Sequence, residues 1–184
     1  MSSRLRPYLT FWVVGLLAVA ADISTKLLVI RKIPFGTYFD SSIGEPIHVF
    51  AGFDLVHIGN KGAAWGIGSE YAVRPFLVFL AAAILVLVWR WRQPLLRELQ
   101  GGQIAFGLFV GGTLGNVHDR IFGEHVTDFL AFTLPFNYRF PAFNVADSCI
   151  CVGVSIYLIM SYRQDAARRE AIVSQGGEDT PKGS

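Results

Sequence analysis

Two aspartates in the second half of the chain have the side chains and spacing best suited to chemistry. Asp147 stands immediately before an apolar run from Ser148 to Tyr162, and Asp128 precedes it in a connecting segment. An ionisable group at the border of a membrane is costly unless it is paired or used. Two carboxylates within hydrogen-bond reach cannot both ionise, so one remains an acid while the other acts as a base. Such a pair would hydrolyse a peptide bond through activated water, and we expect no metal or cofactor.

Local structure offers a plainer explanation of each aspartate. Asn144 and Asp147 are three residues apart, so both side chains would cap backbone donors at the start of a helix. Asp128 follows Thr127 and would cap a helix after a loop. The sequence alone leaves these alternatives open.

Other catalytic classes find no support in the sequence. The four histidines have no nucleophile in a recognisable elbow motif, and no His/Cys cluster has zinc spacing. Cys149 and Cys151 are two positions apart in an apolar run. Residues at that spacing on a helix do not face each other, so we expect two small apolar fillers.

The composition indicates an integral membrane protein. Of 184 residues, 52% are hydrophobic and only 16% are charged, whereas about a quarter of the residues in soluble domains are charged. The net charge of +2 comes without a basic cluster. Binding to nucleic acid is therefore not expected.

Four apolar runs predict four transmembrane helices, at about residues 8–30, 75–91, 103–122 and 144–162. Residues 1–164 would form one membrane-embedded domain, and residues 165–184 a disordered cytoplasmic tail. The first run has a rival interpretation as a cleaved signal peptide, because Ala18-Val19-Ala20 resembles a cleavage site. The run resumes at Leu27 and more runs follow, which favours a retained helix.

Two of these helices carry further signals. Pro75 would lie in the first turn of the second helix, where proline is well tolerated. The third contains glycines that allow close helix contacts, namely Gly107, Gly111, Gly112 and Gly115.

The connection at residues 31–71 predicts a small sheet on the membrane with a mobile flap. Residues 47–50 and 53–58 are typical of short strands, residues 59–62 of a turn, and residues 63–66 of a flexible tip. The connection at 123–141 is rich in Phe and Leu, so we expect it to lie on the membrane interface. The predicted fold class is an all-α integral membrane protein of four transmembrane helices, with a small extracytoplasmic β-sheet and flap in the first outer loop.

The distribution of Lys and Arg predicts that both termini are cytoplasmic. Basic residues flank the spans on that side in short segments, at Arg4, Arg6, Arg90, Arg92, Arg97, Arg163, Arg168 and Arg169. The two aspartates then lie at the outer face. Further polar residues fall near the same level: Asp22, Lys26, Asn60, Asn116 and Arg120.

Two pairs of charged residues near this level allow more than one interpretation. Asp22 and Lys26 are four residues apart and would pair on one helix face. They would form either a structural bridge, with Lys26 reaching toward the interface, or a brace for a buried site. Asp119 and Arg120 would either reach headgroups at a helix end or contribute to the site.

Five sequence blocks, in this order, resemble those of bacterial lipoprotein signal peptidase, the type II signal peptidase. They are Asp22-Ile-Ser-Thr-Lys26, Asn60-Lys-Gly-Ala-Ala-Trp65, Gly111-Gly-Thr-Leu-Gly-Asn-Val-His-Asp-Arg120, Val126-Thr-Asp-Phe129 and Phe143-Asn-Val-Ala-Asp-Ser148. The resemblance covers roughly residues 8 to 162. Trp65 stands where Phe is expected and Thr113 where Ala is usual, and both are mild departures.

The resemblance implies an aspartic endopeptidase of the bacterial inner membrane. It would remove signal peptides from prolipoproteins just before a diacylglyceryl-modified cysteine, and cyclic peptides of the globomycin type would inhibit it. Asp128 and Asp147 would be the catalytic pair. Residues implied in substrate binding or support of the site are Asp22, Lys26, Asn60, Gly62, Ala63, Trp65, Asn116, Asp119, Arg120, Asn144 and Ala146.

Two other functions are compatible with polar residues in a membrane protein. A transporter or proton relay would need polar groups at the midplane, whereas here they gather at one face. A non-catalytic scaffold would tolerate the loss of either aspartate. We therefore favour the peptidase, with membrane lipid and prolipoproteins as its partners.

Overall fold

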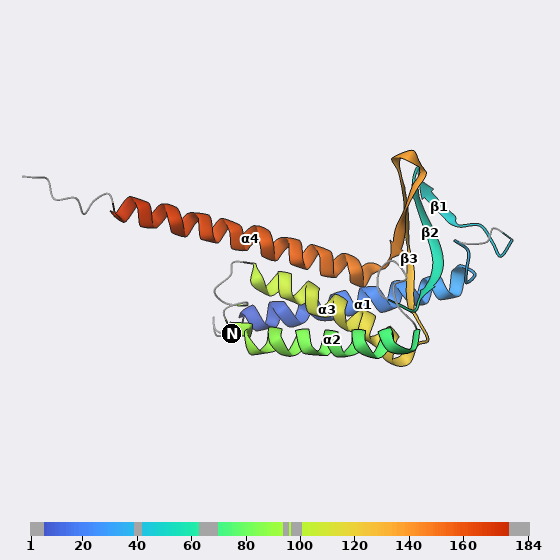
Figure 1. The fold of residues 1–184 in the computed structure, drawn as a ribbon, viewed down its shortest axis with the longest axis horizontal. Coiled ribbons are helices and arrows are strands. Elements are labelled where there is room, and N and C mark those ends of the chain that lie inside the picture. Colours follow the sequence, from blue (N-terminus) through green and yellow to red (C-terminus); the bar gives the residue numbers. More distant parts are fainter. Residues whose placement is uncertain (1–5, 39–41, 63–69, 94–95, 97–100, 177–184) are drawn as a thin grey trace, which may run out of the picture.

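The computed structural model describes residues 6–38, 42–62, 70–93, 96 and 101–176. Within them, four long helices run alongside one another and a four-stranded sheet lies across one end of the bundle (Figure 1). The predicted flap residues Ala63 and Trp65 lie outside the described part. The sheet is larger than predicted, so the all-α description fits only the bundle.

The helices are α1 (Arg6–Lys32), α2 (Glu70–Arg90), α3 (Gly102–Phe122) and α4 (Val145–Gly176). Among the described residues, α1 and α4 contain stretches long and apolar enough to cross a membrane, Tyr8–Lys32 and Val145–Val173. The predicted role of the glycines in α3 is confirmed. A Cβ built on Gly111 would lie 2.5 Å from the carbonyl oxygen of Gly15, so only glycine lets α3 approach α1 this closely.

Two predicted helix boundaries are wrong. Pro75 is inside α2 rather than in its first turn, because the helix begins at Glu70. The predicted disordered tail is helical as far as Gly176. Residues 165–173 are rich in strong helix formers such as Ala, Arg and Glu and contain neither Gly nor Pro, so α4 continues past its apolar part.

The sheet is antiparallel, with strand order β1-β2-β3-β4. Its strands are β1 (Ile47–Phe50), β2 (Phe53–Asn60), β3 (Val126–Leu134) and β4 (Tyr138–Phe143). The first two were predicted, but Gly59 and Asn60 continue β2 instead of forming a turn. The connection predicted to lie on the interface supplies β3 and β4. Its Phe and Leu residues suggested lipid contact, whereas part of the segment pairs with β2, far away in the sequence.

The sheet is fixed to the bundle at its inner end. Val29 and Ile33 of α1 are buried with Phe129 of β3, and Val145 at the start of α4 packs against this cluster. This packing brings β3 next to the first turn of α4. Asp128 and Asp147 stand on these two elements.

Candidate active site

Asp128 is the third residue of strand β3, so the alternative interpretation of Asp128 as a loop-to-helix cap is wrong. Its side chain is buried, with the residue 3% exposed, and both carboxylate oxygens accept hydrogen bonds. The side-chain amide of Asn144 donates to Oδ1 at 2.7 Å and that of Asn60 donates to Oδ2 at 3.0 Å. Asn60 reaches Asp128 because β2 and β3 are paired, with Asn60 opposite Val126.

Asp147 and Asn144 form the reciprocal cap that their spacing predicts. The backbone N–H of Asp147 donates to Asn144 Oδ1 at 3.0 Å, and the backbone N–H of Asn144 donates to Asp147 Oδ2 at 3.2 Å. Both side chains make further hydrogen bonds besides those of the cap. The amide nitrogen of Asn144 also holds Asp128, and Asp147 Oδ1 accepts from the side chain of Asn116 at 2.7 Å.

Asn116 of α3 links the two aspartates. Its Nδ2 donates to Asp147, while its Oδ1 accepts from Asn144 Nδ2 at 3.2 Å and from Lys26 Nζ at 3.2 Å. An amide has two donors and one acceptor oxygen in a plane. Asn116 and Asn144 therefore fix the orientation of both carboxylates relative to each other.

Lys26 is buried behind this pair. Its ammonium group lies 2.7 Å from Asp22 Oδ2 and 2.8 Å from Asp119 Oδ2, in addition to its bond to Asn116. Three N–H donors thus have three acceptors. The interpretation that Lys26 reaches toward the interface is wrong, because the residue is only 3% exposed.

Asp22, which lies on α1, binds the N-terminal end of α4. Its Oδ1 accepts a hydrogen bond from the backbone N–H of Ala146 at 2.9 Å, next to Asp147. A carboxylate is favourable at a helix N-terminus because of the exposed N–H groups and the helix dipole. Gly115 makes room for it, since a Cβ there would lie 2.5 Å from Asp22 Oδ2.

The remaining predicted residues surround this centre. Besides Lys26, Asp119 accepts a bond from the backbone N–H of Thr127 at 3.4 Å, so it is not a headgroup contact. Arg120 donates to the carbonyl oxygen of Asn116 at 3.1 Å, and its charge acts on both catalytic candidates. The backbone N–H of Gly62 donates to Asn60 Oδ1 at 3.1 Å, which fixes the Asn60 amide.

The local environment raises the pKa of Asp128 to about 7. Burial is the main cause, and the neighbouring charge of Asp147 adds to it, while the bonds from Asn60 and Asn144 oppose the rise. Near neutral pH a substantial share of Asp128 is therefore protonated. A protonated carboxyl beside a second carboxylate is the arrangement that acid–base hydrolysis requires.

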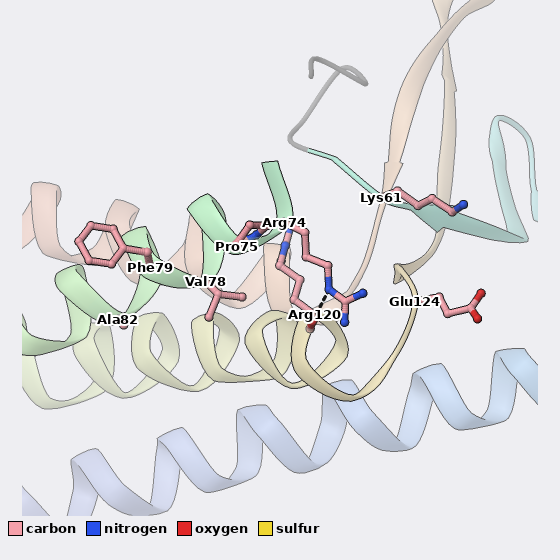
Figure 2. A pocket seen from close by; sticks show the side chains of 8 residues that line it. All are labelled: Lys61, Arg74, Pro75, Val78, Phe79, Ala82, Arg120 and Glu124. Atoms are coloured by element: carbon pink, nitrogen blue, oxygen red, sulfur yellow. Dashed lines mark hydrogen bonds between the residues drawn. The ribbon is translucent and has the colours of Figure 1, made fainter. Parts of the chain in front are cut away.

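A cavity of about 800 Å³ opens between α2 and the end of α3 (Figure 2). Its α2 wall is mainly apolar, and cationic groups lie at the end near the sheet. The lining residues are Lys61, Arg74, Pro75, Val78, Phe79, Ala82, Arg120 and Glu124. Neither aspartate lines this cavity. Arg120 connects it to the site through Asn116.

Arg74 is a residue whose contribution the sequence analysis missed. Its Nε donates to the carbonyl oxygen of Arg120 at 2.6 Å (Figure 2). Its Nη2 donates to the carbonyl oxygen of Gly123 at 2.8 Å. It therefore ties α2 to the end of α3 and neutralises carbonyls that have no partner in the helix. The available signal was a basic residue beside Pro75, which by itself does not indicate a distant helix end.

The fold and the site together define a membrane enzyme with a pair of acids at one end of its helices. Solved structures agree with this class. Two structures, each described as a bacterial membrane enzyme, match with TM-scores of 0.68 and 0.67 at 25% and 27% identity. The first match covers 95% of this chain and 94% of the other, and the second covers 82% and 90%.

The sequence comparisons give the family. Residues 14–163 match the sequence profile of signal peptidase (SPase) II. A lipoprotein signal peptidase of Syntrophotalea carbinolica is 38% identical, over 91% of this chain and 99% of that protein. Those of Aeromonas hydrophila and Francisella tularensis subsp. novicida are 36% and 33% identical, over 82% and 85% of this chain and 87% and 94% of theirs. The chain belongs to the signal peptidase II family, as the sequence blocks predicted, and is therefore a peptidase.

Proposed function

We propose that the chain removes signal peptides from prolipoproteins as an aspartic endopeptidase, with Asp128 and Asp147 as its catalytic pair. Membership of the family supports the removal of signal peptides from prolipoproteins. The observation that carries the catalytic assignment is that Asn144 binds both aspartates. Its side-chain amide donates to Asp128, and its backbone N–H donates to Asp147. The cut would fall on the N-terminal side of the diacylglyceryl-modified cysteine.

The raised pKa of Asp128 makes this residue the acid and Asp147 the base. Asp147 takes a proton from water as the water oxygen attacks the scissile carbonyl carbon, and Asp128 gives its proton to the carbonyl oxygen. The tetrahedral intermediate then collapses and the C–N bond breaks. One hydroxyl of the intermediate returns its proton to Asp128, while Asp147 protonates the leaving amine. Both carboxyl groups end in their starting states.

The polar groups around the pair have supporting roles in this proposal. Asn116 and Asn144 hold the carboxylates, and Lys26 with Asp22 fixes the end of α4 on which Asp147 stands. Arg120 would stabilise the partial negative charge that develops on the carbonyl oxygen in the transition state, before the proton of Asp128 is fully transferred. Asn60, whose side-chain oxygen accepts a hydrogen bond from the backbone N–H of Gly62, would help to hold the Asp128 carboxyl in place.

The cavity beside α2 suits the lipid-bearing part of the substrate. Its apolar wall at Val78 and Phe79 offers a surface for acyl chains, and the cationic side chains of Lys61 and Arg120 could bind carbonyl oxygens of the substrate. Cyclic peptides of the globomycin type would occupy the same space. They should then compete with the prolipoprotein, raising KM without lowering the maximal rate.

The proposed topology has α1 to α4 all crossing the inner membrane, with both termini in the cytoplasm and the site at the outer face. The support is the length of α2 and α3, 21 residues each, against about 20 needed to span the hydrocarbon. Cysteines introduced at Thr133 and Arg168, in a background with Cys149→Ala and Cys151→Ala, test it. A membrane-impermeant thiol reagent applied to cells with a permeabilised outer membrane should label Thr133→Cys but not Arg168→Cys. The reverse pattern would reject the proposed orientation.

The catalytic pair is tested by Asp128→Asn and Asp147→Asn in the purified enzyme. Each should lower the cleavage rate by roughly 10²- to 10⁴-fold, the usual contribution of a general acid or base, in a gel-shift assay with a lipidated prolipoprotein. Asp54→Asn is the matched control, because Asp54 lies on the sheet and pairs with His48. Near-normal cleavage by either site variant would reject that aspartate as catalytic.

A further inference from the structure

The C-terminal end of α3 is capped by a residue of another helix. The last carbonyl groups of a helix have no N–H partner within it. At this end, Arg74 of α2 donates to the carbonyl oxygens of Arg120 and Gly123, at 2.6 Å and 2.8 Å. A cation is favourable there, because the helix dipole places partial negative charge at a C-terminus. Arg74 thus caps α3 from a position 46 residues before Arg120 in the sequence.

The capped turn is the link between α3 and the strand of Asp128. It is tight, since the backbone N–H of Gly123 donates to the carbonyl oxygen of Asp119 at 2.8 Å, and a Cβ on Gly123 would lie 2.9 Å from that oxygen. Strand β3 begins shortly after it, at Val126. The two bonds of Arg74 therefore join α2 to the segment from which the candidate active site is built.

The rest of α2 offers little that would fix its position. Every side chain from Pro75 to Val88 is apolar. Lipid tails are as apolar as these side chains, so in a membrane such a surface gives little drive for association with a particular neighbour. Hydrogen bonds from a charged donor are directional and stronger than neutral ones. Under the proposed topology, the two bonds of Arg74 would set both the height and the rotation of α2.

The cavity between α2 and the end of α3 lies directly beside this contact (Figure 2). Arg74 and Arg120 both line it, and Val78, Phe79 and Ala82 form its α2 wall. Because the two helices face each other across this space, their separation determines its width. The bonds of Arg74 end on backbone carbonyls, so they act on the shape of the cavity and do not depend on a ligand.

We propose that Arg74 is a positioning residue that sets the width of the substrate cavity by fixing the α2 wall to the end of α3. The two catalytic candidates are held by the amides of Asn60, Asn116 and Asn144, none of which lies on α2. Loss of the Arg74 bonds should therefore weaken substrate binding and spare the chemical step. The inference rests on the proposed function for the identity of the substrate, whereas the position of α2 is measurable without any substrate.

Distances between two spin labels on the full chain in lipid nanodiscs test the position of α2. In a background with Cys149→Ala and Cys151→Ala, labels at Phe76→Cys on α2 and Val152→Cys on α4 occupy exposed positions. Double electron–electron resonance should give one narrow distance distribution when Arg74 is present. With Arg74→Gln the distribution should become several-fold broader, because α2 is no longer fixed.

Arg92→Gln is the matched control for this measurement. Arg92 also donates to a carbonyl oxygen, but to that of Trp89, three residues away, at 2.8 Å. Its removal should leave the distance distribution narrow. Arg74→Lys keeps the charge, yet an ammonium group lacks the rigid fork that reaches two carbonyls. Its distribution should be intermediate, and it provides the same test if Arg74→Gln does not fold.

The consequence for binding is tested by steady-state cleavage of a lipidated prolipoprotein, with rates expressed per folded enzyme. Arg74→Gln should raise KM several-fold and change kcat little, whereas Asp128→Asn should lower kcat. Arg74→Lys should recover only part of the loss in KM. Full recovery by Arg74→Lys would show that the charge matters and the paired bonds do not, which would reject the positioning role.

Two further outcomes would overturn the proposal. A lower unfolding temperature for Arg74→Gln, with an unchanged distance distribution and KM, would show that Arg74 only stabilises the fold. A broader distribution with an unchanged KM would show that the position of α2 does not govern binding. Failure of the proposed function gives a different result, because Asp128→Asn and Asp147→Asn would then cleave normally while the distances still respond to Arg74→Gln.

Discussion

Asp22 on α1 and Asp128 on β3 are both buried carboxylates, but Asp22 is paired with a cation, whereas the hydrogen-bond donors to Asp128 are neutral amides. Asp22 lies 2.7 Å from the ammonium of Lys26 and accepts a backbone N–H of α4. Asp128 is held by two amide groups and lies near a second acid, and its pKa rises to about 7. The first region stabilises a fixed charge, whereas the second leaves a proton available. The comparison separates a carboxylate that organises the site from one suited to chemistry.

The largest expected effect contrasts Asp128→Asn with Asp22→Asn. Asp128→Asn should remove cleavage and leave the unfolding temperature unchanged or higher, because the amide needs no buried charge. Asp22→Asn should instead lower stability, since it breaks an ion pair and weakens the hold on α4, while folded protein still cleaves. Rates normalised to the folded fraction, with the unfolding temperature of each variant, measure both. Similar profiles for the two variants would contradict the comparison.

A second variant tests how much the ammonium group of Lys26 contributes to stability. Lys26→Met leaves Asp22 and Asp119 buried without their partner, which should cost roughly 3–5 kcal/mol of unfolding free energy. Lys32→Met, at the exposed end of α1, is the control and should change little. The double variant with Asp22→Asn should recover part of the loss. An unchanged unfolding temperature for Lys26→Met would show that the ion pair adds no stability.

The pH dependence separates the two regions further. Because Asp128 must be protonated to act as the acid, kcat/KM should fall as pH rises above about 7. Folded Asp128 also binds its proton more tightly than the unfolded chain, whose carboxyl titrates near 3.8. Its contribution to stability is therefore fully present below about pH 4 and is lost as pH rises through 7. A rate that stays constant up to pH 9 would contradict the assignment.

The smallest effect comes from Asn60→Ala. This change removes a hydrogen bond that lowers the pKa of Asp128. The alkaline limb of the rate profile should then move to higher pH, with a modest change in rate at pH 6. Asp54→Asn, on the same sheet and paired with His48, serves as a control for the pH profile. A limb that moves to lower pH with Asn60→Ala would show that this bond stabilises the protonated form instead.

Local spacing predicted the contacts that lie within one helix turn. The separation of four between Asp22 and Lys26, and of three between Asn144 and Asp147, sufficed because a helix places such residues together. The order of blocks also led to the correct family. Contacts between distant segments were not predictable in this way. The bond from Asp22 to the N–H of Ala146 joins residues 124 apart, and only the packing of α1 against α3 and α4 creates it.

The same distinction explains the missed strands. Residues 126–134 contain Phe and Leu beside Thr and Asp, a mixture that fits a strand as well as a membrane-surface segment. Their partner in the sheet is β2, encoded before two intervening helices. Because strand pairing depends on that remote partner, single-segment patterns do not determine it.

The hold that Asp22 exerts on the start of α4 has a consequence for biosynthesis. Asp128 is encoded on β3, the strand that follows α3, and Asp147 on the last helix, while Asp22, which binds the start of that helix, is on the first helix. Under the proposed mechanism, a ribosome-bound chain that has not yet released α4 therefore lacks a working centre, and cleavage begins only once α4 has packed against α1 and β3.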